Sequence, residues 1–185
     1  MSKTKYFLQN MTKITENDIE LWAIEELENL GWQYVHGAEI APDGEQAERV
    51  SFRHVILKDR LQQAIARNNT EIPFEAQQEA LKVIERIVSP ELMVNNQEFH
   101  VMLTEGVPVE YRKDGVQRGD RVKLINFEQP DQNEFLVVNQ FTIIENNNNK
   151  RPDVILFVNG LPLVLFELKN AIDENATLHS AFKQI

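Results

Sequence analysis

The chain has 185 residues, 42% hydrophobic and 26% charged, a balance typical of a globular protein with a buried core and not of a disordered or fibrous one. It has no cysteine, which excludes disulfides and thiolate metal sites, so any bound metal must use oxygen or histidine ligands. With 19 basic and 29 acidic residues the net charge is −10, which argues against a stand-alone protein that holds duplex DNA by bulk electrostatics.

The sequence also limits where the protein acts and which cofactors it uses. No run of residues approaches the ~20 apolar residues of a membrane span, so we expect a soluble, cytoplasmic protein. A phosphate-binding glycine loop is absent, so the chain alone should not hydrolyse ATP. The four histidines lack the spacing of metal ligands and are interpreted as structural or surface residues: His36, His54, His100 and His179.

The first predicted helix spans 16–30. Thr15 and Asp18 form a helix-start pattern, and Gly31 is a natural stop. The apolar stripe of this helix consists of Ile19, Ala23, Leu27 and Leu30. Glu20 lies at the border of the stripe, where it is either a side chain that reaches out to solvent or an accessory acid that faces a site.

A helical insert is predicted near 52–105. A short strand at 32–35 and a polar loop precede it. Amphipathic periodicity and helix-stop residues predict three helices, at 52–67, 74–88 and about 91–105. We expect this insert to serve packing.

From Val107 onward the apolar period becomes that of strands. The predicted strands are 107–111, 121–125, 135–138 running on to 141–144, and the two strands of a hairpin at 151–170. Turns are predicted at 113–115 and 130–133, and the asparagine-rich run 145–149 is expected to be a surface loop. Apolar residues from about Asp173 onward predict a closing helix without a stop signal, which indicates a piece of a longer chain.

Five basic residues are candidates for a phosphate-binding rim: Arg112, Lys113, Arg118, Arg121 and Lys123. They surround a predicted turn and a strand edge, where a solvated surface is the simpler explanation. The sequence therefore favours a surface role for them.

The hairpin carries charges at the ends of two apolar strands. Glu167 and Lys169 are two residues apart, so both side chains leave the same face of a strand. A two-residue turn at 159–160 would place Asp153 on the opposite face, whereas a three-residue loop would place Asp153 on the face of Glu167. A catalytic interpretation therefore requires a loop with an odd number of residues.

On a shared face, Asp153 and Glu167 can hold a hard divalent cation, completed by the carbonyl of Leu168 and by water. Mg²⁺ favours a site with few carboxylates, retained water and substrate phosphate. Lys169 would position or deprotonate the attacking water and stabilise the developing negative charge, which describes phosphodiester hydrolysis. In the structural alternative the charges only mark where the strands leave the core, and Asp153 caps a turn.

Residues 151–153 (Arg-Pro-Asp) and 167–169 (Glu-Leu-Lys) match the PD-(D/E)xK nuclease signature. Together with segments 133–140 and 106–111 and the sequence of the hairpin, they resemble the N-terminal nuclease domain of the restriction (motor) subunit of type I restriction-modification enzymes. The expected fold is α/β, a restriction-endonuclease-like mixed β-sheet of about five strands flanked by helices on both sides. A single nuclease domain would span 1–185, with a helical part at about 15–105 and a catalytic sheet at about 107–185.

The resemblance implies an endonuclease that cuts double-stranded DNA with Mg²⁺, away from its recognition site, after ATP-driven translocation by helicase domains outside this chain. The implied partners are double-stranded DNA and the methyltransferase and specificity subunits, which would deliver the DNA. Gln184 fits the first position of the family's Gln-x-x-x-Tyr motif, whose Tyr would fall beyond residue 185. Glu20 resembles the acidic residue that related nucleases carry on their first helix.

Two other functions remain open at this point. One is a non-catalytic docking module that ties a DNA motor to its partners, which would have no reason to bind Mg²⁺ between Asp153 and Glu167. The other is the exonuclease domain of a recombination helicase, which would prefer free DNA ends to closed circles. For the preferred nuclease we expect the chain alone to cut DNA weakly or not at all, because it lacks the motor and is acidic.

Overall fold

The computed structural model describes residues 15–86, 91–145 and 148–169. The chain forms two compact units. The first comprises Met1–Arg53, Val137–Leu156 and Leu163–Ile185, and the second comprises His54–Leu136 and Phe157–Pro162. Among the described residues no helix is both long and apolar enough to cross a membrane.

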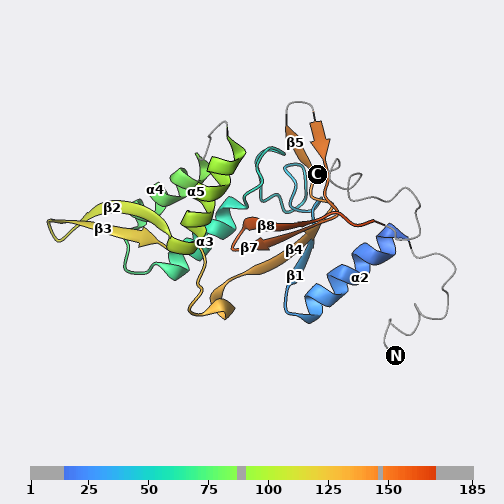
Figure 1. Cartoon of the computed structure of the whole chain (residues 1–185), viewed down its shortest axis with the longest axis horizontal. Helices are drawn as coiled ribbons and strands as arrows, with labels where there is room; N and C mark the ends of the chain where they lie inside the picture. Colours follow the sequence, from blue (N-terminus) through green and yellow to red (C-terminus); the bar gives the residue numbers. More distant parts are fainter. Residues whose placement is uncertain (1–14, 87–90, 146–147, 170–185) are drawn as a thin grey trace. The chain divides into compact units, whose positions relative to one another are not determined.

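The secondary structure is mixed α/β, as the sequence predicts (Figure 1). The helices are α2 (Glu16–Asn29), α3 (Lys58–Asn68), α4 (Phe74–Glu85), α5 (Leu92–Glu105) and the short 3-10 helix η1 (Pro130–Gln132). The strands are β1 (Gln33–His36), β2 (Val107–Lys113), β3 (Val116–Val122), β4 (Phe135–Asn139), β5 (Ile143–Glu145), β6 (Asn148–Lys150), β7 (Val154–Val158) and β8 (Leu161–Phe166).

Helix α2 begins and ends where its sequence indicates. The side chain of Thr15 accepts the backbone N–H of Asp18, and the Asp18 carboxylate accepts the backbone N–H of Thr15 at 2.9 Å. Gly31 follows the helix with φ of 95°, a conformation that costs glycine little. The predicted stripe is wrong at its end: Leu30 is 77% exposed, because the helix stops at Asn29 and the chain turns away.

The helix-start pair makes a pH-dependent contribution to stability. Two hydrogen bonds from Thr15, its side chain first and then its backbone, lower the pKa of Asp18 below its ordinary value of 3.8. The stabilisation is therefore fully present above pH 3.8 and is lost as the pH falls through the lower folded-state pKa. We expect Asp18→Ala to lower the Tm at neutral pH. In thermal unfolding scans, this difference from the wild type should shrink as the pH falls below 3.8.

In the part of the chain that the structure describes, the central sheet has four strands, and not about five as the sequence predicts, in the order β1-β4-β7-β8. The N–H of Gly37, just after β1, donates to the carbonyl of Asn139 at the end of β4, so these two strands run parallel. Strand β7 runs antiparallel to β4, since the N–H of Gln140 donates to the carbonyl of Asp153 at one end of the pair. Helix α2 covers the sheet through Ile24, which packs against Val137, Val154 and Leu156 (Figure 1).

Four sequence predictions about strands are corrected. The predicted strand 135–138 does not run on to 141–144, because β4 ends at Asn139 and β5 begins at Ile143 in another sheet. Segments 107–113 and 116–122 pair with each other in a separate two-stranded sheet, so they do not extend the central one. Strand β3 spans Val116–Val122 and not the predicted 121–125. The two-residue turn at Asp114 and Gly115, both with positive φ, fixes its register with β2, so that Val122 lies opposite Val107, the first residue of β2. Part of the asparagine run is a strand and not a loop, since β6 pairs with β5. The expected closing helix lies outside the described residues.

The helical insert is confirmed in the second unit, with one boundary changed. Helices α3 and α4 pack together and α4 packs against β2, which buries Leu61, Ile65 and Leu81. The first of these helices begins at Lys58 and not at residue 52. Residue Leu57 is fully buried and its N–H donates to the carbonyl of Gly160 at 2.9 Å, so the preceding backbone is held by the hairpin turn.

The β7–β8 hairpin closes with a two-residue turn. Asn159 and Gly160 have φ of 53° and 79°, and both lie between the two strands. The catalytic interpretation required a loop with an odd number of residues, and this prediction is therefore wrong. A side chain at position 160 would meet the carbonyl of Leu57 at 2.5 Å, which leaves room only for glycine.

Candidate active site

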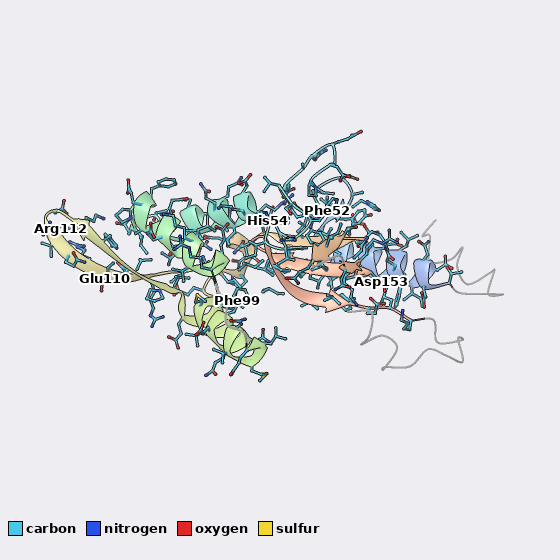
Figure 2. All side chains as sticks on the ribbon, turned by 90° about the horizontal axis from the view of Figure 1, so that it is seen from above. Phe52, His54, Phe99, Glu110, Arg112 and Asp153 are labelled. Carbon is cyan, nitrogen blue, oxygen red and sulfur yellow. The ribbon has the colours of Figure 1, made fainter. Side chains whose placement is uncertain are left out.

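Asp153 meets the Glu-Leu-Lys segment in spite of the two-residue turn. Strand β7 begins at Val154 and β8 ends at Phe166, so Glu167 lies just outside the paired strands. Asp153, labelled in Figure 2, likewise lies just before β7. The alternation of side chains between faces does not apply to such residues. The backbone N–H of Leu168 donates to Asp153 Oδ2 at 2.6 Å, a short charge-assisted hydrogen bond. The irregular strand ends therefore bring together what a regular hairpin would separate.

Glu167 and Lys169 form a close ion pair. Lys169 Nζ lies 3.1 Å from Glu167 Oε1, and the side chains are 22% and 8% exposed, respectively. Burial lowers the pKa of Lys169, but the hydrogen bond to Glu167 and the charges of Glu167, Glu16 and Asp153 outweigh it and raise this pKa above 10.5. Lys169 is therefore an ammonium at neutral pH, set among three carboxylates.

Glu20 is buried and is held by two amide side chains. It is 7% exposed, so it does not reach out to solvent from the border of α2. Asn139 Nδ2 donates to Glu20 Oε1 at 2.7 Å. Gln140 Nε2 lies 3.3 Å from Oε1 and 3.1 Å from Oε2 of the same carboxylate. The hydroxyl of Tyr34 in turn donates to Asn139 Oδ1 at 3.0 Å.

Asn139 and Gln140 are site residues that the sequence reasoning did not single out. They are two consecutive polar residues directly after Phe135–Val138, an apolar strand segment. Carboxamides at the end of a buried strand need hydrogen-bond partners, so the sequence could have indicated that these two side chains contact other polar groups. Gln140 also joins Glu20 to the hairpin, because its backbone N–H donates to the carbonyl of Asp153 at 3.2 Å.

The donor chemistry of Asp153 and Glu167 fits a hard divalent cation. Within the described residues no group of three or more His, Asp or Glu could hold a metal, so Glu20 does not join these two acids in one cluster. Their hydrogen bonds to described residues use one oxygen each, Asp153 Oδ2 and Glu167 Oε1. A pair of carboxylates suits Mg²⁺, which binds to few carboxylates and keeps several waters. Gln184 lies outside the described residues.

The candidate phosphate rim belongs to the second unit. Arg112 lies on β2 near the turn of the β2–β3 hairpin (Figure 2). Arg118 lies on β3, opposite Tyr111 of β2. The other three candidates form ion pairs with carboxylates of this unit: Lys113 with Glu71, Arg121 with Glu105, and Lys123 with Glu128. Exposed ion pairs of this kind support the interpretation of a solvated surface.

Comparisons with known proteins identify the class of enzyme subunit to which the chain is related. The chain is homologous to endonuclease subunits of type I restriction enzymes. It is 38% identical over 172 residues to the HindI endonuclease subunit of Haemophilus influenzae. It is 36% identical over 197 residues to a protein of Methanocaldococcus jannaschii named as the type I restriction enzyme MjaIXP endonuclease subunit.

These alignments cover nearly all of this chain and a small part of each relative. They span 92% and 98% of the chain but only 16% and 19% of the two relatives. A family model for the N terminus of the type I restriction enzyme R protein matches residues 13–185. The chain therefore belongs to the family of type I restriction enzyme R protein N-terminal domains.

Proposed function

We propose that this chain is a Mg²⁺-dependent nuclease domain that hydrolyses phosphodiester bonds of double-stranded DNA. The observation that carries the proposal is the 2.6 Å hydrogen bond from Leu168 N to Asp153 Oδ2, together with the 3.1 Å pair of Lys169 and Glu167. These contacts join two carboxylates and an ammonium at adjoining strand ends. We further propose that the sheet is of the restriction-endonuclease type and that 1–185 acts as one nuclease domain.

Each residue has a proposed chemical role. Asp153, Glu167 and the carbonyl of Leu168 hold Mg²⁺, which when bound lowers the pKa of a water and offsets charge on the phosphate. Lys169 orients the attacking water and stabilises negative charge on the phosphate oxygens. The hydrogen bond to Glu167 and the nearby carboxylates favour its ammonium form, which can act by charge and hydrogen bonding.

Glu20 and Gln184 have supporting roles in this proposal. Glu20 is fixed by Asn139 and Gln140, which suits a carboxylate that organises the site without binding the metal itself. Gln184 would act from the segment after Glu-Leu-Lys, for which the sequence predicts a helix.

The domain would work as part of a larger enzyme. We propose that ATP-driven motor domains further along the same polypeptide translocate DNA, and that the methyltransferase and specificity subunits recognise and deliver it. Cleavage then falls away from the recognition site. The net charge of −10 is consistent with a nuclease that receives DNA from its partners and does not bind it tightly alone.

Metal binding by the 185-residue chain tests the proposal. In calorimetric titrations with Mg²⁺ or Mn²⁺ we expect one saturable binding event in the wild type and its loss in Asp153→Ala. A matched control is Asp131→Ala, which removes the same charge from an exposed position in η1 and should bind like the wild type. Equal heats from Asp153→Ala and the wild type would instead favour the non-catalytic docking module.

A further inference from the structure

Gln140 has an unusual backbone conformation at a junction of the site. It directly follows β4 and has φ of 53°, in the left-handed region that a residue other than glycine seldom adopts. Such a conformation persists only where the surrounding contacts hold it, and it occurs often at functional sites. The contacts of the Gln140 side chain and of its backbone therefore need to be considered in turn.

The side chain of Gln140 is anchored to helix α2. Its Nε2 lies within 3.3 Å of both oxygens of Glu20, a carboxylate that also accepts a hydrogen bond from Asn139. Because Glu20 is almost fully buried, the hydrogen bonds to it are little weakened by water. This anchor therefore compensates the cost of the left-handed backbone at Gln140.

The backbone of Gln140 reaches the hairpin. Its N–H donates to the carbonyl of Asp153 at 3.2 Å, just before β7 begins. The carboxylate of Asp153 accepts the N–H of Leu168, and Leu168 lies between Glu167 and Lys169. One series of hydrogen bonds thus runs from Glu20 through Gln140 and Asp153 to the Glu-Leu-Lys segment.

We propose that Gln140 is a positioning residue for the metal-binding carboxylate. Anchored by Glu20, Gln140 fixes the peptide of Asp153 and thereby sets the distance of its carboxylate from Glu167 and Lys169. The proposal rests on the proposed nuclease function and assigns to Gln140 a role that acts through Asp153. Partners that orient metal ligands typically change metal affinity by about 10- to 100-fold when they are removed.

The first test is Mn²⁺ affinity, measured by calorimetry on the 185-residue chain. We expect Gln140→Ala to raise the Kd for Mn²⁺ by at least about tenfold. The matched control is Gln77→Ala in α4. Gln77 is a buried amide that donates to the carbonyls of Asn69 and Ile72, so its loss should lower the Tm and leave the Kd unchanged.

The second test follows the short hydrogen bond itself and needs no metal. The amide proton of Leu168 should resonate far downfield in ¹H–¹⁵N spectra, since it donates to Asp153 at 2.6 Å. We expect it to move upfield in Gln140→Ala and in Glu20→Gln, and to stay in place in Gln77→Ala. A defect that only lowers global stability would not move this one resonance selectively.

A second variant protects the test against a failure to fold. Gln140→Gly accepts the left-handed backbone and keeps the backbone N–H, but it loses the anchor to Glu20. It should show the same rise in Kd and the same upfield shift. A wild-type Kd together with an unmoved Leu168 resonance in this variant would overturn the positioning role. If wild type and Asp153→Ala bind Mn²⁺ equally, the nuclease proposal fails, while the Leu168 resonance still decides the role of Gln140.

Discussion

Under the proposed function, replacing Asp153 with alanine in a complete endonuclease subunit assembled with partner subunits should abolish DNA cleavage while ATP hydrolysis continues. Asp153 is expected to bind the metal, and its Oδ2 also fixes the N–H of Leu168. The substitution therefore removes a ligand and releases the segment that carries Glu167 and Lys169. We expect a loss of at least about 10³-fold in cleavage rate, which corresponds to about 4 kcal/mol of transition-state stabilisation.

Linearisation of plasmid at saturating Mg²⁺ and ATP, with phosphate release followed in the same sample, measures both activities. Asp131→Ala provides the charge-matched control and should cleave at the wild-type rate. Asp153→Asn keeps the shape of the side chain and should be nearly as inactive, because a neutral amide is a poor ligand for Mg²⁺. Cleavage at the wild-type rate by Asp153→Ala would rule out this carboxylate as part of the nuclease site.

Replacing Asn159 with alanine should strongly destabilise the second unit. Asn159 is fully buried and has φ of 53° in the hairpin turn. Its Nδ2 donates to the carbonyl of Leu124 at 2.9 Å and to Asn133 Oδ1 at 2.8 Å. Its Oδ1 accepts the N–H of Glu134 at 2.8 Å and lies 3.4 Å from Arg67 Nη2.

Alanine leaves several of these buried groups without partners and tolerates the left-handed backbone less well than asparagine. We expect the free energy of unfolding to fall by about 3–5 kcal/mol, measured from urea denaturation curves. Asn159→Gly should recover only the part of this free energy that comes from the strained left-handed backbone, and not the part that comes from the lost hydrogen bonds. Asn96→Ala, at an exposed position of α5, should change stability by less than about 0.5 kcal/mol. A loss below about 1 kcal/mol for Asn159→Ala would show that the hydrogen bonds of the turn matter little.

Local features of the fold could be predicted from the sequence because they depend on neighbouring residues. The helix-start pair of Thr15 and Asp18 and the stop at Gly31 define α2 within a residue or two. The turn at Asp114 and Gly115 is likewise visible in the sequence, since both residue types tolerate positive φ. The pattern of Asp153, Glu167 and Lys169 is short and common by itself, and it indicated a candidate site mainly through the resemblance of the surrounding hairpin to a nuclease family.

The tertiary structure decided which strands pair and how the site is assembled. Strands β2 and β3 form a local hairpin, but whether such a hairpin also joins the central sheet depends on residues far away in the sequence and not on local propensity. Asp153 reaches Leu168 across a two-residue turn because both lie beyond the regular strands, where alternation no longer predicts the face.

The burial of Glu20 is the strongest case of a feature that only the tertiary structure decides. The sequence by itself determined that this acid sits at the edge of an apolar helix face. Its partners Asn139 and Gln140 lie more than a hundred residues away, and only folding brings their amides to the carboxylate. A buried carboxylate needs such hydrogen bonds to offset its lost hydration, so its role depends on contacts that no local pattern contains.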